Sequence, residues 1–365
     1  MRLSDKLSGK DNNLNLVRFV AAFAVLVSHS FVLATGDFSG EPLRASLGMS
    51  LGEIAVDIFF AASGFLVARS LVQRKSGVEF LWARLLRIYP ALIAMIVLCV
   101  LVVAPAFGTL GFYDLLFAHG TRHFVFQNLT LVRGVELTLP GLFENAPWKG
   151  IVNGSLWTMT YELRLYLSLV GLWWLLRPFP RLRPKLFMAS CTAIALLALV
   201  WYARTLTVGQ TDKVGLIDPV PRLVLMFYAG TAWWIFSGKV ILDGRLLLAS
   251  GAVLAAARLA GAETLFHLLF ALWLPYAVWW LAFVPAGAIR GFNRIGDCSY
   301  GLYIYAFPLQ QIWAISFPGA GPWAMVAGAG TATVLLGFLS WHLLEKRALT
   351  HKNLPGRFFP HLAGR

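Results

Sequence analysis

Charged residues and cysteines are scarce in this sequence. Only 13% of the 365 residues are charged, whereas 58% are hydrophobic. A soluble multidomain enzyme is excluded, because soluble domains are about 25% charged. The three cysteines, Cys99, Cys191 and Cys298, stand far apart from one another. This spacing indicates neither a disulfide framework nor a zinc site.

Long apolar runs dominate what remains, and the mean hydropathy is +0.70. Each run is about 20 residues long, enough for a helix to cross the hydrocarbon core of a membrane. The predicted spans are 16–36, 52–73, 88–108, 154–178, 185–206, 220–237, 241–259, 263–284, 297–317 and 320–345. We therefore predict an all-α integral membrane protein, a bundle of about ten transmembrane helices. The predicted transmembrane domain is 1–345, followed by a basic cytoplasmic tail over 346–365.

The basic residues are divided unevenly between the two sides of this bundle. The termini and the loops on their side hold 22 of the 31 Lys and Arg residues, the opposite loops hold eight, and Arg164 lies within a span. Because positive charge gathers on the cytoplasmic side of membrane proteins, both termini are predicted to be cytoplasmic. Membrane topology thus accounts for the net charge of +14, and no nucleic-acid partner is expected.

Two ionisable residues, Arg18 and His29, lie within the first predicted span. Eleven helical steps place them within about 20° of one helix face and about 16 Å apart along the axis. Arg18 would then lie at the cytoplasmic mouth and His29 in the outer half of the bilayer, where one long ligand could touch both. The alternative is that Arg18 is a positive-inside anchor and His29 a buried, hydrogen-bonded residue.

Two carboxylates lie at a depth similar to that of His29. Asp57 falls about 8 Å and Glu162 about 12 Å inside the outer ends of their spans. A histidine beside a carboxylate is suited to proton transfer, because the carboxylate orients the imidazole and raises its basicity. The alternative for either acid is an ion pair, with Arg69 or Arg164 as candidate partner.

Arg84 and Arg87 precede Tyr89 and Pro90 at the predicted start of the third span. Guanidinium groups near the free amides of a helix N-terminus would suit a phosphate. The alternative is that both arginines only follow the positive-inside rule.

The long loop over 109–153 combines apolar stretches with glycine and proline, a pattern typical of interfacial or re-entrant segments at a cavity mouth. His119 and His123 have the i, i+4 spacing of metal ligands on a helix. No third ligand is evident near them, so no metal site is predicted.

Six segments, in order, resemble those of acyltransferase family 3, membrane enzymes that O-acylate glycans and other hydroxyl acceptors. They are NLVRFVAAFAVLVSHS, VDIFFAASGFLVARSL, FLWARLLRIYPAL, GSLWTMTYELRLYL, CSYGLYIYAFPL and WHLLEKRAL. Arg18 and His29 match the family's basic residue and histidine with ten positions between them. Arg84 and Arg87 match its paired arginines, and Glu162 matches the glutamate after its Ser-Leu-Trp segment.

The chain departs from the family pattern at two places. Asn15, Leu16 and Val17 precede Arg18, where Leu-Asp-Gly-Leu is commoner. Tyr305 to Pro308 follow the later tyrosine helix, where family members often have a histidine.

The resemblance implies an O-acyltransferase of the cell inner (plasma) membrane. It would transfer an acyl group, acetyl being the first candidate, from cytoplasmic acyl-coenzyme A to a hydroxyl of a cell-envelope glycan or glycolipid. The implied partners are membrane lipid and this acceptor, and any glycan-processing partner would be a separate protein. No metal is implied.

The resemblance also implies roles for individual residues. The predicted catalytic set is His29, as general base or transient acyl carrier, with Glu162 to orient it. Asp57 joins this set on its depth beside His29 and not on the resemblance. The predicted donor-binding set is Arg18, Arg84, Arg87, Ser63 and Tyr300.

Two other function classes are consistent with buried charges in a membrane bundle. In a proton-coupled transporter or flippase of a glycan precursor, His29, Asp57 and Glu162 would relay protons. No internal repeat favours that class. A non-catalytic membrane scaffold would not need intact buried charges, so it is the weakest of the three.

Overall fold

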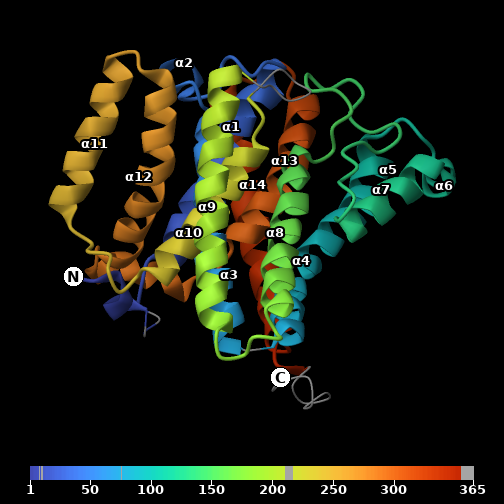
Figure 1. Ribbon diagram of the computed structural model, residues 1–365. Helices are drawn as coiled ribbons and strands as arrows, with labels where there is room; N and C mark the ends of the chain where they lie inside the picture. Colours follow the sequence, from blue (N-terminus) through green and yellow to red (C-terminus); the bar gives the residue numbers. More distant parts are fainter. Residues whose placement is uncertain (8, 10, 75, 210–216, 355–365) are drawn as a thin grey trace. The chain divides into compact units, whose positions relative to one another are not determined.

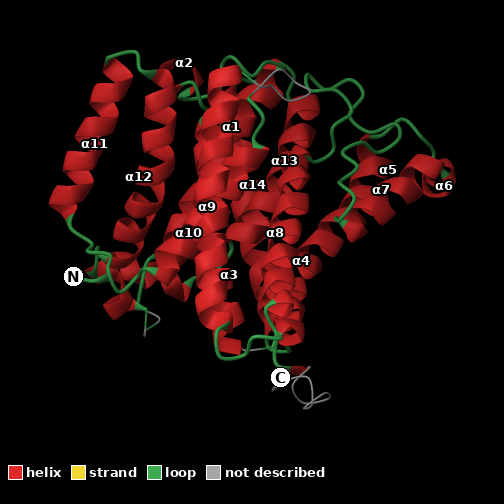
Figure 2. Cartoon of the chain, in the orientation of Figure 1, coloured by secondary structure: helices red, strands yellow, loops and turns green. Residues whose placement is uncertain are grey.

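The computed structural model describes residues 1–7, 9, 11–74, 76–209 and 217–354. Throughout this part the regular elements are helices, and β-pairing is limited to isolated bridges (Figure 2). The longer helices are α1 (Leu14–Thr35), α3 (Leu51–Arg74), α4 (Gly77–Leu98), α7 (His119–Thr130), α8 (Trp157–Leu175), α9 (Arg183–Val208), α10 (Val220–Ile235), α11 (Gly244–Leu259), α12 (Glu263–Phe283), α13 (Ser299–Ser316) and α14 (Pro322–Ser340) (Figure 1). The all-helical prediction is confirmed.

Shorter elements complete the described chain. They are η1 (Leu3–Lys6), α2 (Arg44–Leu47), the π-helix η2 (Cys99–Val103), α5 (Ala104–Phe107), α6 (Phe112–Phe117), η3 (Gly154–Leu156), η4 (Gly287–Arg294), the π-helix η5 (Trp341–Glu345) and α15 (Lys346–Leu349). Since π-helices are uncommon and frequent at functional sites, η2 and η5 mark positions of interest.

Within the described residues, six helices are long and apolar enough to cross a membrane. They are Leu14–Thr35, Leu51–Arg74, Gly77–Phe107, Arg183–Val208, Glu263–Phe283 and Pro322–Leu349. The other four predicted spans coincide with α8, α10, α11 and α13. Helices α10 and α11 have only 16 residues each, and α8 and α13 carry charged or polar side chains along their length. A membrane protein is thus supported, and the count of ten stays a prediction.

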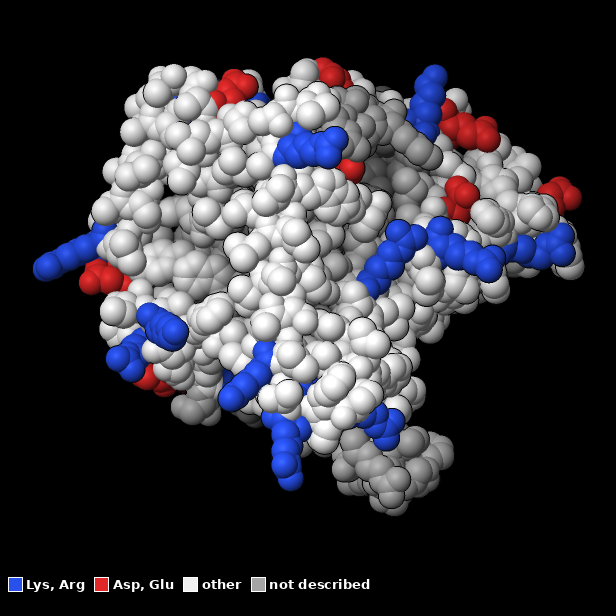
Figure 3. Space-filling view, viewed as in Figure 1, with Lys and Arg blue, Asp and Glu red and all other residues white. Residues whose placement is uncertain are grey.

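The described chain forms two compact units. Unit 1 comprises residues 1–18, 56–77 and 165–294, and unit 2 comprises 19–55, 78–164 and 295–365 as far as these are described. In unit 1, α11 and α12 lie side by side, and α10 packs on α9 (Figure 1). Most of the surface shown in Figure 3 carries neither acidic nor basic side chains, as expected where helices face hydrocarbon.

Helix α3 approaches α10 very closely in unit 1. A Cβ atom added at Gly64 would lie 1.8 Å from the carbonyl oxygen of Phe227, and one added at Gly230 would lie 2.1 Å from that of Ala61. The Thr231 hydroxyl donates a hydrogen bond of 3.1 Å to the Gly64 carbonyl oxygen. Small residues at such contacts let backbones meet, which is how helices associate within membranes.

The third predicted span begins earlier than its sequence suggested. Helix α4 starts at Gly77 and runs through Pro90, and η2 and α5 continue it to Phe107. Arg84 and Arg87 therefore lie within the helix, where the backbone amides are already bonded. The prediction that they flank a helix N-terminus was wrong, because Pro90 is an interior proline rather than the first residue of the span.

In unit 2, α14, η5 and α15 form one helical run that passes through Glu345 to Leu349. The boundary predicted at 345 therefore falls inside a helical run, and residues 355–365 of the predicted tail lie outside the described residues. At the other end of α4, the loop over 109–153 contains the short helices α6 and α7 (Figure 1).

Candidate active site

His29 lies in the C-terminal half of α1, and its ring meets the edge of Phe307 on α13 at a centroid distance of 5.3 Å. The His29 Nδ1 atom is buried and has no hydrogen-bond partner within the described part of the chain. An imidazole nitrogen in that position can accept a proton from a bound molecule or donate one to it.

Polar contacts fix the turn of α1 that carries His29. The Gln310 side-chain amide, on α13, donates hydrogen bonds of 2.7 Å to the Leu26 carbonyl oxygen and to Ser30 Oγ. Gln310 and Ser30 are fully buried. Since buried polar groups are costly to leave unsatisfied, these bonds fix the rotation of α1 and hence the direction of His29.

A cluster of charged residues adjoins His29 in the chain. Ser28 Oγ donates a 2.6 Å hydrogen bond to Glu41 Oε1, and the Arg44 guanidinium lies 2.5 Å from Glu41 Oε2 and 3.3 Å from Glu53 Oε2. Burial raises the pKa of the Glu41 carboxyl above its usual range, and outweighs the lowering by Ser28 and Arg44. This cluster ties the segment after α1 to the helix itself.

Glu162 belongs to the same unit as His29 and lies in the first half of α8. It is near enough to Tyr300 and Tyr303 of α13 to interact with them electrostatically. The Tyr303 hydroxyl lies 2.6 Å from Thr158 Oγ1 and donates a 3.0 Å hydrogen bond to the Ser155 carbonyl oxygen. The start of α8 is thereby tied to α13, the helix whose Phe307 contacts His29.

Asp57 belongs to unit 1 and is fully buried. Its Oδ1 atom lies 3.2 Å from Nε of Arg222, which is 8% exposed. The ion pair anticipated as the structural alternative is therefore present, but its basic partner is neither Arg69 nor Arg164. Arg69 donates to the Leu7 carbonyl oxygen and Arg164 to the Val132 carbonyl oxygen.

Arg87, a predicted donor-binding residue, contacts two carboxylates and two aromatic rings. Its Nη2 lies 2.7 Å from Asp297 Oδ2, and its Nη1 lies 3.5 Å from Glu345 Oε2. The rings of Tyr300 and Trp341 lie 5.8 and 5.6 Å from the guanidinium carbon, within the range of cation–π contacts. With one positive and two negative groups, this cluster carries a formal charge of −1.

The cluster depends on the π-helix η5, which places Trp341 and Glu345 on the same side of the chain. Glu345 is fully buried and accepts a 3.0 Å hydrogen bond from Ser340 Oγ. Gly301 lets this carboxylate approach α13, since a Cβ there would lie 3.2 Å from Glu345 Oε1. Asp297 is held in turn by the Ser299 hydroxyl at 2.6 Å.

The remaining donor-binding candidates lie in both units. In unit 1, Arg18 lies over the Phe59 ring at 6.0 Å, and the hydroxyls of Ser63 and Tyr166 are 3.0 Å apart. In unit 2, Arg84 lies over the Phe80 ring at 5.9 Å. Tyr300 donates a 2.9 Å hydrogen bond to the Ile88 carbonyl oxygen.

Unit 2 thus holds His29, Glu162, Arg84, Arg87 and Tyr300, whereas unit 1 holds Arg18, Asp57 and Ser63. The roles predicted for these residues stay predictions.

Sequence reasoning missed Arg222 and Asp297, the partners of two predicted site residues. Arg222 lies two residues inside the predicted span 220–237, and a basic residue at that position is a usable signal for a buried ion pair. Asp297 lies just outside α13, and only the fold brings it to Arg87.

Comparisons with known proteins agree on one family. The family model described as an acyltransferase domain, Acyl_transf_3, matches residues 11–342. An O-acetyl transferase of Shigella phage Sf6 is 26% identical, with 94% of this chain and 98% of that protein covered. Nodulation protein 10 of Rhizobium leguminosarum is 29% identical, with 94% of each chain covered.

The exopolysaccharide production protein ExoZ of Rhizobium meliloti is 26% identical, with 87% of this chain and 95% of that protein covered. No solved structure matches the chain at a significant level. Because the family model spans nearly the whole sequence, the resemblance is confirmed: this chain belongs to the acyltransferase 3 family and is an acyltransferase.

Proposed function

We propose that this protein is an integral-membrane O-acyltransferase with about ten spans and cytoplasmic termini in the cell inner membrane. It transfers an acyl group, with acetyl as the first candidate, from cytoplasmic acyl-coenzyme A to a hydroxyl of a cell-envelope glycan or glycolipid. The observation that carries the proposal is the buried His29 Nδ1 without a partner in the described chain, in a sequence matched to an acyltransferase family over 11–342. The name of the phage O-acetyl transferase supports acetyl as the acyl group, and the name of the exopolysaccharide production protein ExoZ supports a polysaccharide as the acceptor.

His29 acts as the general base in this proposal. Its imidazole takes the proton from the acceptor hydroxyl while the hydroxyl oxygen attacks the carbonyl carbon of the thioester. The new C–O bond forms, the C–S bond breaks, and the departing sulfur takes up a proton. Glu162 orients the imidazole, and direct transfer keeps a labile acyl-imidazole out of contact with water.

The arginines bind the phosphates of the donor in this proposal. Arg18 and Arg84 contact them through charge-assisted hydrogen bonds, and the pantetheine arm extends toward His29. Arg87 lies between Asp297 and Glu345, so it reaches a phosphate only by giving up at least one carboxylate. Ser63 and Tyr300 stay in the donor-binding set through their places in the motifs.

The direct test is acyl transfer by purified protein, with release of the coenzyme A thiol as the readout. Replacing His29 with alanine should reduce transfer at least about a hundredfold, the usual contribution of a general base. The matched control is His267→Ala, because His267 is also buried and its Nε2 also lacks a hydrogen-bond partner in the described chain. Its Nδ1 is bonded within α12 to the Glu263 carbonyl oxygen at 2.8 Å. A folded His29→Ala protein with near-normal thiol release would remove His29 from the mechanism.

A further inference from the structure

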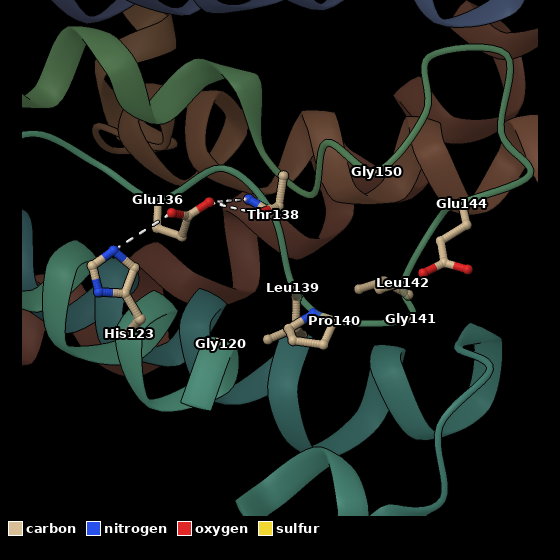
Figure 4. Close-up of a pocket in the computed structure, with 10 residues that line it drawn as sticks. All are labelled: Gly120, His123, Glu136, Thr138, Leu139, Pro140, Gly141, Leu142, Glu144 and Gly150. Carbon is tan, nitrogen blue, oxygen red and sulfur yellow. Dashed lines mark hydrogen bonds and ion pairs between the residues drawn. The ribbon is translucent and has the colours of Figure 1, made fainter. Parts of the chain in front are cut away.

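A cavity of about 260 Å³ opens between α7 and the loop that follows it in unit 2 (Figure 4). Its polar lining comes from His123 on α7 and from Glu136, Thr138 and Glu144 on the loop. The volume is just below the range of about 300–1,000 Å³ that holds drug-sized ligands. It therefore suits a small ring, such as one sugar unit.

The loop that forms this cavity is preorganised. The Asn128 side chain donates to the Glu136 carbonyl oxygen at 2.8 Å and accepts from the Glu136 backbone N–H at 3.1 Å. Leu139, Leu142 and Phe143 bury their side chains beneath the loop. Phe143 also has a φ of +62°, a left-handed conformation that a bulky residue adopts only where its surroundings impose it.

The polar groups of the cavity are mostly hydrogen-bond acceptors. Glu136 Oε1 accepts from Thr138 N at 3.0 Å and from Thr138 Oγ1 at 2.5 Å, while Oε2 lies 3.6 Å from His123 Nε2. Glu144 extends on the other side of the cavity (Figure 4). A carboxylate on each side can accept hydrogen bonds from ligand hydroxyls, and the His123 ring supplies a donor or an acceptor.

The same loop continues to residues that pack close to His29. The Gln311 side chain on α13 donates 2.7 Å hydrogen bonds to the Trp148 and Ile151 carbonyl oxygens. These two residues pack against a cluster that contains Phe307, the residue whose ring meets His29. The segment between the cavity and the His29 region is therefore short and fixed within one unit.

We propose that this cavity holds a sugar unit of the acceptor and selects neutral or amino sugars over uronic acids and other acidic sugars. The inference rests on the proposed function for its acceptor class. The selection follows from charge, because Glu136 and Glu144 both face the cavity and no Lys or Arg lines it in the described chain. An anionic sugar would meet repulsion from both carboxylates, whereas neutral hydroxyls or an ammonium group would be bound.

The test is binding of the full-length detergent-purified protein to an array of neutral, amino and uronic-acid oligosaccharides. We expect binding to the neutral and amino glycans at least about tenfold stronger than to the acidic ones, comparable to one charged hydrogen bond. Glu136→Gln and Glu144→Gln should each weaken that binding, and Glu144→Lys should raise binding to uronic acids. Asp114→Asn is the control, since Asp114 is exposed on α6 and lies outside the cavity lining.

Equal binding of acidic and neutral glycans, no glycan binding at all, or variants indistinguishable from wild type would each overturn the proposal. Because the Glu144 side chain is exposed, its variants test the cavity even if Glu136→Gln fails to fold. Release of thiol from acetyl-coenzyme A is measured in parallel. Wild-type protein that releases thiol but lacks this selectivity would refute the cavity alone, whereas absent thiol release would refute the proposed function.

Discussion

The buried pair of Asp57 and Arg222 gives a residue-level test of whether a predicted catalytic acid has a structural role. Asp57 is fully buried, and its partner guanidinium lies 3.2 Å away. Removing one member of such a pair leaves an uncompensated charge, which costs about 3–5 kcal/mol, whereas removing both costs much less.

We therefore expect Asp57→Asn to lower the free energy of unfolding by about 3–5 kcal/mol and to reduce acyl transfer with it. The double variant Asp57→Asn with Arg222→Met should regain most of both. Thermal unfolding in detergent and thiol release are the measurements. A double variant that is stable yet inactive would contradict this expectation and support the catalytic role predicted from the sequence.

Some site residues could be placed from the sequence alone, whereas the partners of others could not. The position of His29 in the C-terminal half of α1 could be predicted, because helix periodicity fixes it relative to Arg18. The Arg222 partner of Asp57 could not, since 165 residues separate them along the chain and only the packing of α3 on α10 brings them together. For Arg87, the family motif indicated the residue but not the two carboxylates that surround it.

At the scale of the elements, α4, α13 and η5 combine to form the Arg87 cluster with its formal charge of −1. Asp297 and Glu345 compete with any phosphate for the guanidinium. If Arg87 binds the donor, removal of one carboxylate charge should help the donor to bind.

Replacing Glu345 with Gln should therefore raise coenzyme A affinity by about threefold, the size of a modest charge interaction. The glutamine can still accept the hydrogen bond from Ser340, so folding should persist. Calorimetric titration of the purified protein measures the affinity. Glu263→Gln is the control, because it removes the same charge from a side chain that is 74% exposed. Unchanged or weaker affinity in Glu345→Gln would indicate that Arg87 only holds the helices together.

The close packing of α3 on α10 can be tested by substituting its glycines. Gly64→Ala should destabilise the protein by about 1–3 kcal/mol, because the added methyl would overlap the Phe227 carbonyl oxygen. Gly171→Ala, in α8, is the matched control. Apart from its chain neighbours and its own helix backbone, no atom of the described chain lies within 4 Å of the position a methyl would take there. Better helix propensity should therefore stabilise the protein by up to about 1 kcal/mol. Melting temperatures of the two variants that shift in the same direction would contradict this packing.

The lengths of the elements show where sequence patterns fail. Hydropathy located most helices to within three residues, but it began the third span at 88, whereas α4 begins at Gly77. The earlier turns carry Glu79, Arg84 and Arg87, whose charges lower the hydropathy of an otherwise largely apolar segment. They are helical because tertiary contacts, such as the bond from Tyr300 to the Ile88 carbonyl oxygen, hold charged turns within α4.

At the scale of the whole molecule, the sequence matches an acyltransferase family over residues 11–342. The described chain also has six helices long and apolar enough to cross a membrane. We propose that the donor binds at the cytoplasmic side and the acceptor at the opposite side of the membrane, with His29 between them. A soluble acyltransferase would not require donor and acceptor on opposite sides of a membrane. A transporter would not break the thioester bond of the donor.

The most direct measurement uses proteoliposomes in which the protein is uniformly oriented. Acetyl-coenzyme A labelled in the acetyl group is supplied on the side of the termini, and de-esterified envelope polysaccharide on the other side. We expect thiol release on the donor side and transfer of the label to the polysaccharide on the other side of the membrane. Both should be lost in His29→Ala. Label transferred only when donor and acceptor share one side, or polysaccharide moved without thiol release, would contradict this proposal.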